Sequence, residues 1–381
     1  MKIFHIIDSA GIYGAEMVLL NLLQGQLKMG LSPLLCSVGD VDEDEKPLET
    51  TAQALGIPVC KVRIPRGLKL KSGLRLLREA KNFKADIIHL HGYKDTILVG
   101  LLPGFFKKIP VVRTLHGWTS KTRLSKIWLY EKLDKFCLKR VDGIVSVNTK
   151  LVDQVQQFIK QSPVIAIENG ISPLKFNIEK ILQEDSKLAE FCRHGFVIGG
   201  IGRFSMVKGF HFLVEAMSLL VKKRPEIKLL LVGEGTGQAE MESIIQSQEL
   251  GKHVFFTGYK QNAARYLPLL EIFVMPSLSE GLPIVLLEAM LAKVPIVATR
   301  VGGVPEVLAQ GKYGKLAEPE SAKSLAQSVL YVMDHLDDAR LRAVMAEARV
   351  LKKYSSKRMA EKYFDFYHLV LAKKTGYHES A

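Results

Sequence analysis

Two glutamates mark the most distinctive pattern in the sequence, the run SEGLPIVLLEAM, where Glu280 and Glu288 stand eight residues apart. Pro283 suits the first turn of a helix, so Glu280 is expected at or before the helix start and Glu288 about two turns further along. Carboxylates accept hydrogen bonds from pairs of hydroxyls, and free amides beside Gly281 suit an anion. The alternative for this pair alone is a helix cap and a solvated face.

Two cations follow a probable strand in the run GIGRFSMVKGF, where Arg203 and Lys208 stand five residues apart. Ligands of open α/β sheets bind at the carboxyl ends of strands, which is where this loop falls. A guanidinium fork and an ammonium point charge suit a diphosphate. The alternative is a pair of ordinary surface cations.

Three further segments supply weaker candidates. The loop DSAGIYGAE places Gly11 and Gly14 before a helix, but the GxGxxG spacing is absent, and a plain turn is the alternative. His116 ends a buried strand and is expected at the binding edge of a sheet. In IIHLHG, His91 is nearer the strand end and is the binding-edge candidate, whereas His89 is expected to point into the packing.

Metal and cofactor chemistry finds little support in the sequence. Asp42, Glu43 and Asp44 lie in the charged run DVDEDEKP, which indicates a solvated loop, and no His, Cys and Asp cluster has metal spacing. The four cysteines are far apart and indicate core thiols. We therefore expect no metal site and no cofactor.

The elements that must position these residues indicate an α/β fold. Short apolar runs end in glycine or polar turns and alternate with helical patterns, which is typical of parallel sheets. The pattern starts afresh near residue 195, so the 381 residues suit two Rossmann-like domains. We expect domains at residues 1–172 and 190–352, followed by a helix over 353–381 that packs back toward the first domain. The expected strands lie at 2–7, 31–38, 85–91, 111–116, 143–148, 164–169, 195–202, 227–233, 253–258 and 271–277.

The net charge of +14 is concentrated in one part of the chain. Between Lys61 and Arg140 there are 20 basic and five acidic residues, so this segment alone carries +15. Such a surplus suits an anionic partner or surface. The sequence shows neither a membrane-spanning run nor a signal peptide, which predicts a cytosolic protein.

These pieces together resemble the retaining glycosyltransferases of family 4. The resemblance covers almost the whole chain. The resemblance rests on the motifs YGAE, RTLHG, IENGI, GIGRFSMVKG, LLLVGEG and FFTGY and on the long block MPSLSEGLPIVLLEAMLAKVPIVATRVGGVPEVL.

The resemblance implies a GT-B fold, in which two Rossmann-like domains face each other across a deep cleft. The first domain would bind the acceptor and the second would bind the nucleotide sugar.

The resemblance also implies roles for single residues. Glu280 would bind hydroxyls of the donor sugar, and Glu288 the ribose. Arg203 and Lys208 would neutralise the diphosphate, and His116 would touch the sugar near its reacting carbon. The remaining donor-binding positions are Gly14, Gly281, Ile284 and Val285 at the phosphates and Gly233, Gly258 and Tyr259 at the base.

The implied reaction is retaining transfer of a sugar, a hexosyl transfer, from a nucleotide-diphosphate donor to a hydroxyl acceptor. With two fixed cations at the diphosphate, no metal ion is required. A nucleotide-sugar epimerase on the same fold is the alternative activity. Nucleic-acid binding is the alternative that the charge prompts, but no nucleic-acid-binding module is recognisable, so no nucleic-acid partner is expected.

Two basic and apolar clusters in the first domain predict a peripheral enzyme at the inner face of the cytoplasmic membrane. The acceptor would then be a lipid-linked or envelope polysaccharide precursor. The first cluster spans Lys61 to Lys84, with nine basic residues and interleaved leucines. The second consists of Phe105, Phe106, Lys107, Lys108, Lys121, Arg123, Lys126, Trp128 and Lys132.

Overall fold

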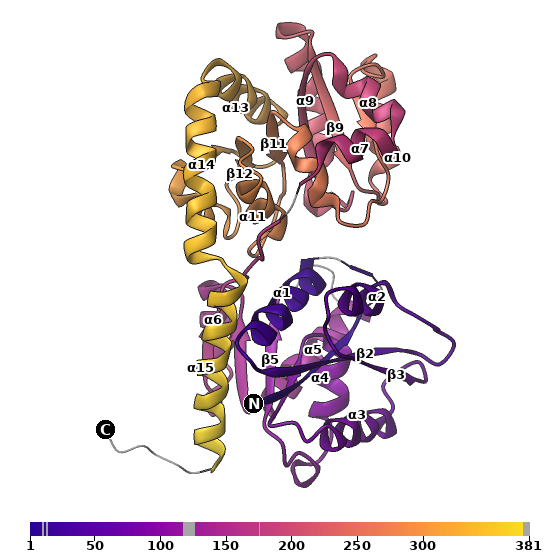
Figure 1. Cartoon of the computed structure of the whole chain (residues 1–381), viewed down its shortest axis with the longest axis vertical. Coiled ribbons are helices and arrows are strands. Elements are labelled where there is room, and N and C mark those ends of the chain that lie inside the picture. Colours follow the sequence, from indigo (N-terminus) through magenta and orange to yellow (C-terminus); the bar gives the residue numbers. More distant parts are fainter. Residues whose placement is uncertain (10, 13, 117–125, 175, 376–381) are drawn as a thin grey trace. The chain divides into compact units, whose positions relative to one another are not determined.

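The computed structural model describes residues 1–381 except 10, 13, 117–125, 175 and 376–381 (Figure 1). Its contacts divide the chain into two compact units, residues 1–172 with 356–381, and residues 173–355. Each unit is built on one parallel sheet with helices on both faces.

The first unit contains a sheet of seven strands in the order β3-β2-β1-β4-β5-β6-β7. Its strands are β1 Lys2–Asp8, β2 Ser32–Asp40, β3 Val59–Ile64, β4 Ile87–Leu90, β5 Val111–Leu115, β6 Gly143–Ser146 and β7 Val164–Ala166. Its helices are α1 Gly14–Lys28, α2 Pro47–Ala54, α3 Leu70–Asn82, α4 Tyr93–Gly100, α5 Lys126–Leu138, α6 Thr149–Gln156 and α15 Ser356–Thr375, with the short 3-10 helix η1 Gly104–Phe106.

The second unit contains a sheet of six strands in the order β10-β9-β8-β11-β12-β13. Its strands are β8 Phe196–Ile201, β9 Ile227–Val232, β10 Val254–Phe256, β11 Ile272–Met275, β12 Ile296–Thr299 and β13 Lys315–Ala317. Its helices are α7 Ile178–Glu184, α8 Ser186–Arg193, α9 Phe210–Lys223, α10 Gln238–Ser247, α11 Ile284–Leu291, α12 Val304–Val307, α13 Ala322–Asp334 and α14 Leu336–Lys353. The 3-10 helices are η2 Met206–Lys208, η3 Ala263–Leu269 and η4 Ala309–Gly311.

The strand order in each sheet reverses beside its first strand, as in doubly wound α/β folds. Right-handed crossovers then place helices on opposite faces. In the first unit, Leu19 and Leu23 of α1 pack with Leu35 of β2 on one face. Leu76 of α3 and Leu98 of α4 belong to the core on the other face. The central strands are buried on both sides, which explains their continuous apolar runs.

Helix α15 returns to the first unit and packs against α1. Gly25 of α1 permits this contact, because a Cβ there would lie 2.7 Å from the Ser356 carbonyl oxygen and 2.9 Å from the Ala360 Cβ. A side chain at this point would push the two helices apart.

The structure differs from the local expectations at one helix and at three strands. The run NAARYLPLL, expected as an α-helix, contains the 3-10 helix η3, because Pro268 inside it cannot donate an intrahelical hydrogen bond. Strands β12 and β13 were not expected, and neither was strand β3. Strand β3 lies at the sheet edge and alternates exposed Lys61 and half-buried Arg63 with buried Val62, so its apolar signal is diluted.

Candidate active site

The second unit gathers its candidate residues at one edge of its sheet. Arg203 and Lys208 follow β8, Gly233 follows β9, Gly258 follows β10 and Glu280 follows β11. Because all these strands are parallel, the loops that follow them meet at the carboxyl edge.

The turns expected at the nucleotide base lie next to each other. The Gly233 amide donates to the Gly258 carbonyl at 3.1 Å, and Tyr259 is exposed beside them. Gly233 has a φ of +140°, and a Cβ there would stand only 2.0 Å from the Gly202 carbonyl oxygen. Only glycine therefore lets the loops after β8, β9 and β10 come this close.

Glu280 is held by two neighbours through a single oxygen. Its Oε1 lies 2.7 Å from the Lys208 Nζ and accepts a hydrogen bond from the Ser277 Oγ at 2.7 Å. The Glu280 side chain is only 8% exposed. Its Oε2 has no hydrogen-bond partner within the described part of the chain, so this oxygen is available to a ligand.

Lys208 and Arg203 differ in how firmly they are positioned. Lys208 ends η2, and Gly209 turns the chain into α9 with a φ of +64°. A Cβ at Gly209 would stand 2.2 Å from the Pro276 carbonyl oxygen, so this turn is packed against the loop that carries Glu280. Arg203 is exposed in the loop after β8. The structure thus brings Lys208 and Glu280 into contact and leaves Arg203 exposed in the loop after β8.

A glycine pair after β12 supports the Glu280 loop, and the sequence reasoning assigned it no role. The Gly303 amide donates to the Gly281 carbonyl at 3.0 Å. A Cβ on Gly302 would stand 1.7 Å from the Glu280 carbonyl oxygen. Ser277 was also missed. The available signal was a glycine pair that directly follows a buried strand in TRVGGVPEV.

Helix α11 starts four residues after Glu280 and offers open amides. It begins at Ile284, and its N-cap residue Pro283 provides no side-chain hydrogen bond. The Leu286 amide bonds back to the Pro283 carbonyl at 3.2 Å, whereas Ile284 and Val285 precede any intrahelical acceptor. The helix start with Gly281 beside it therefore suits an anion.

Glu288 lies one turn into α11 and is buried. Burial raises the pKa of Glu288 to about 7, and desolvation is its cause. Within the described residues, no side-chain hydrogen bond compensates this carboxyl group. A pair of hydroxyl donors would supply the missing hydrogen bonds.

Gly14 and His116 belong to the first unit. Gly14 is the first residue of α1 and is exposed. A Cβ at this position would have no described neighbouring atom within 4 Å. His116 directly follows β5, and its Nε2 is covered and has no hydrogen-bond partner among the residues that the structure describes. Burial and the nearby Arg113 lower the pKa of His116 to about 3, so the ring is neutral at ordinary pH. A neutral imidazole can hydrogen-bond a sugar hydroxyl without adding charge.

His91 directly follows β4, as expected, but its side chain is turned into the packing and not toward a ligand. It is buried, and its Nε2 lies 3.0 Å from the Nδ1 of His5. His5 comes from β1, the neighbour of β4, so the pairing depends on a strand order that local spacing does not reveal. His89 does point into the packing, as expected, with its nitrogens 2.7 Å from Tyr367 and from Thr114.

These three histidines form a cluster that the sequence spacing did not predict. One ring nitrogen from each of His5, His89 and His91 lies within 4.8 Å of the others, a donor set that could hold a transition metal. The His5 Nε2 donates to the side-chain Oε1 of Gln26 at 2.9 Å, so its Nδ1 accepts from His91. Hydrogen bonds therefore already account for this arrangement.

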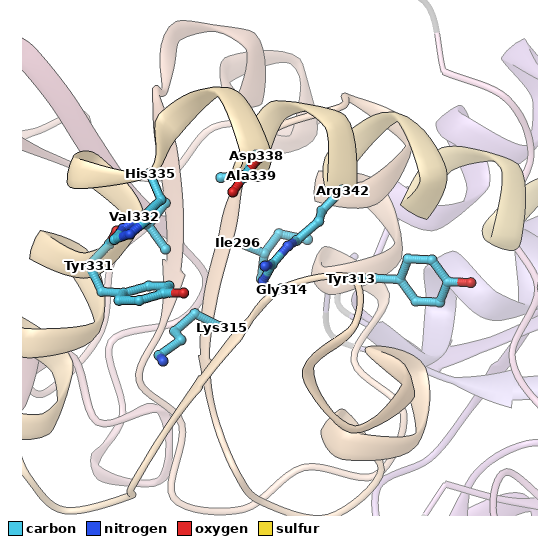
Figure 2. Close-up of a pocket in the computed structure, with 10 residues that line it drawn as sticks. All are labelled: Ile296, Tyr313, Gly314, Lys315, Tyr331, Val332, His335, Asp338, Ala339 and Arg342. Carbon is cyan, nitrogen blue, oxygen red and sulfur yellow. The ribbon is translucent and has the colours of Figure 1, made fainter.

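A pocket in the second unit lies away from the candidate residues. Ile296 and Lys315, the first residues of β12 and β13, lie on one side of it, and side chains of α13 and α14 on the other (Figure 2). These strand starts mark the edge of the sheet opposite the loops that carry Lys208 and Glu280. The pocket is therefore separate from the candidate active site.

Comparisons with known proteins agree on one class. The model of the family described as glycosyl transferases group 1 matches residues 192–349, and that described as Glycosyltransferase Family 4 matches residues 12–173.

The chain is also similar to curated proteins and to solved structures. It is 24% identical to the capsular polysaccharide biosynthesis glycosyltransferase CapM of Staphylococcus aureus, over 98% of this chain and 99% of that protein. It is 25% identical to the N-acetyl-alpha-D-glucosaminyl L-malate synthase of Bacillus anthracis, over 81% and 80%. The structure of Anabaena Alr3699/HepE in complex with UDP-glucose matches with a TM-score of 0.82 and 20% identity, over 97% of this chain and 100% of that one.

The two parallel-sheet units and their structural relatives define a two-domain GT-B glycosyltransferase fold. The two family models together cover most of the chain, which belongs to the family 4 type of glycosyltransferases. Glycosyl transfer, rather than epimerisation, is the activity of this family. No helix in the described ranges is long and apolar enough to span a membrane.

The raised pKa of Glu288 predicts a pH dependence of nucleotide binding. An ionised carboxylate accepts both ribose hydroxyls better than a protonated one, so binding should strengthen as the pH rises through about 7. We expect the Kd of UDP, measured by calorimetry, to fall between pH 6 and pH 8 in both the natural protein and the Glu288→Gln variant. The fall should be about tenfold larger in the natural protein. Titration of the nucleotide phosphate is common to both proteins. Parallel Kd curves would contradict the assignment, and ADP and GDP serve as probes if UDP does not bind.

Proposed function

We propose that this enzyme transfers a sugar, a hexosyl group, from a nucleotide-diphosphate donor to a hydroxyl acceptor with retention of anomeric configuration. The observation that carries this proposal is the contact between Lys208 and Glu280 beside the open start of α11. One arrangement thus combines a cation and amides for the diphosphate with a carboxylate oxygen for the sugar.

The chemistry requires charge stabilisation at the leaving group. The bond between the anomeric carbon and the phosphate oxygen breaks while negative charge grows on the diphosphate. Lys208, Arg203 and the amides of Ile284 and Val285 meet that charge, and such preorganised donors usually contribute the largest catalytic effect. Glu280 holds the Lys208 ammonium through Oε1 and offers Oε2 to sugar hydroxyls.

Retention follows from attack on the same face of the sugar. The acceptor oxygen bonds to the anomeric carbon, and its proton passes to the departing phosphate oxygen. No protein nucleophile is needed, because the departing phosphate oxygen takes the acceptor's proton, and Glu280 is assigned to binding through its contacts with Lys208 and Ser277. His116 of the first unit is assigned to the donor sugar, because its ring is neutral and its covered Nε2 has no hydrogen-bond partner within the described ranges.

The proposed acceptor is a lipid-linked or envelope polysaccharide precursor. Relatives support this choice: one is named for capsular polysaccharide biosynthesis, and an Escherichia coli relative at 25% identity is a UDP-Gal:alpha-D-GlcNAc-diphosphoundecaprenol alpha-1,3-galactosyltransferase. The match with that enzyme spans 75% of this chain and 76% of the enzyme.

The proposed place of action is an anionic membrane surface, reached through the first unit. Helices α3, α4 and α5 pack side by side, so α3 and α5 flank α4 on one face of the sheet. Leu70 and Leu74 of α3 are exposed, as are Phe105 and Phe106 of η1 and Phe136 of α5. Exposed cations surround them: Lys69, Lys71, Arg75, Arg78, Lys81, Lys84, Lys108 and Lys132. We call this set the basic-apolar face.

Three cations of the first expected cluster form ion pairs within the first unit and are left out of the basic-apolar face. Lys61 pairs with Glu45 at 2.7 Å, and Arg66 with Asp40 at 2.9 Å. Arg63 pairs with the buried Glu49 at 2.9 Å. These three cations belong to β3 and the loop after it, and they neutralise acidic residues of 40–49 rather than face a partner. In the second cluster, Lys121 and Arg123 lie outside the described residues, as does the side chain of Lys126.

Donor turnover tests the site assignment. We expect Glu280→Ala and Lys208→Ala each to reduce transfer by at least about a hundredfold, because each removes a group that acts as charge separates. The assay follows release of UDP, GDP or ADP from a panel of donors, first without acceptor and then with polyprenyl-linked sugars. The exposed residues Glu240 and Lys252 of the same unit provide matched controls as Glu240→Ala and Lys252→Ala. Unchanged turnover in either site variant, with an unchanged circular dichroism spectrum, would refute the assignment.

Chelation tests the proposed metal independence. We expect EDTA to leave transfer largely intact, because Lys208 and Arg203 supply the positive charge. Product is measured by direct chromatography, so that no coupling enzyme responds to the chelator. Complete loss of activity that Mg²⁺ or Mn²⁺ restores would show that a metal ion carries this role.

Vesicle binding tests the basic-apolar face. We expect the protein to co-sediment with vesicles that contain anionic lipid at low salt and to be released at high salt. The double variant Lys71→Gln/Arg78→Gln should bind roughly thirtyfold more weakly, since each cation contributes about 1 kcal/mol near the surface. Phe105→Ser should also bind more weakly, whereas Leu219→Ser, at an exposed leucine of α9, should not. A protein that stays in the supernatant at low salt would refute membrane binding and leave the transfer proposal standing.

A further inference from the structure

Helix α14 has two opposite apolar faces, of which only one is used within the second unit. Ala343, Ala346 and Val350 are buried on the inner face, and α14 packs against α11. On the outer face Leu341 is 66% exposed, Val344 54%, Met345 47% and Leu351 47%. Four large exposed apolar side chains on one 18-residue helix form a continuous strip rather than scattered surface residues.

The spacing of this outer strip is that of a helix-pairing seam. Positions 337, 341, 344, 348 and 351 alternate in steps of four and three, the a and d pattern of coiled coils. Ala348 is exposed and small, so it leaves room for a large side chain from another helix.

The charges on the strip are arranged for an antiparallel copy of the same helix. Asp337 lies at its start and Lys352 at its end, both exposed and without an ion pair within the described part of the chain. Three other charges of α14 form ion pairs within the chain: Arg340 with Glu271, Glu347 with Lys293 and Lys353 with Glu306.

A twofold axis between Val344 and Met345 pairs these two residues across the interface and places Leu351 opposite Asp338 at its margin. It places Asp337 opposite Lys352 of the second copy and Leu341 opposite its Ala348, a large side chain against a small one. Each contact then occurs twice, as an isologous interface requires. A parallel arrangement would instead place Asp337 opposite Asp337.

We propose that the outer strip of α14, defined by Asp337, Leu341, Val344, Met345, Ala348, Leu351 and Lys352, is the interface of a homodimer with two antiparallel α14 helices. The proposal is independent of the sugar-transfer reaction. A single helix pair buries less than the about 1,200 Å² that stable interfaces need, so the dimer should be weak and depend on concentration.

Sedimentation velocity on the full chain tests the interface. Between 2 and 200 µM, roughly the range over which a weak contact forms, we expect the 42.5 kDa monomer to shift toward a dimer. Leu341→Gln/Val344→Gln should abolish the shift, and Leu219→Gln, an exposed leucine elsewhere in the same unit, should preserve it. A monomer at every concentration, or a dimer unaffected by the double variant, would overturn the proposal.

Charge exchange tests the antiparallel register. Asp337→Lys and Lys352→Asp should each raise the dimer dissociation constant about tenfold, because each brings like charges together twice. The two changes combined in one chain should restore dimerisation, since the opposite charges then meet again. Failure of the combined variant to recover would refute the antiparallel pairing. Both positions are exposed, and circular dichroism checks that the helix is intact.

Discussion

Parallel pairing of every strand is the constraint on which the candidate site depends. In a parallel sheet, a helix connects the end of each strand to the start of the next. All the loops that follow the strands therefore lie at the same edge of the sheet. Residues far apart in sequence, such as Lys208 and Glu280, thereby come into contact. Close approach of these loops in turn requires glycine at Gly209, Gly233 and Gly302, where a Cβ would meet a neighbouring carbonyl oxygen.

Availability of the site groups to a ligand is the second consequence of this packing. Among the residues that the structure describes, Glu280 has partners for one oxygen and none for the other, and the buried Glu288 has no side-chain hydrogen bond. Such a carboxyl group costs free energy in the unbound protein. That cost is consistent with a binding residue and not with a residue kept for stability, because stability would favour an apolar side chain at this position in α11.

The sequence predicted most strands of both sheets and pointed to the residues of the candidate site, because buried parallel strands and glycine-bearing loops leave local patterns. It did not predict contacts that depend on strand order. His5 meets His91 only because β1 lies beside β4, and Gly302 supports Glu280 only because β12 lies beside β11. Strand β3 was missed because an exposed edge strand has alternating charges instead of an apolar run.

The charge surplus of the first unit separates into groups with different roles. Lys61, Arg63 and Arg66 are balanced by acidic residues of 40–49, and the buried Arg113 lies 3.8 Å from Asp134. Glu79 is the single acidic residue in the sequence of α3, which carries several exposed cations. The surplus is therefore a property of one surface rather than of the whole unit. Because that surface is built by α3, η1 and α5, changes in its affinity for anions need not alter the loops that hold Lys208 and Glu280.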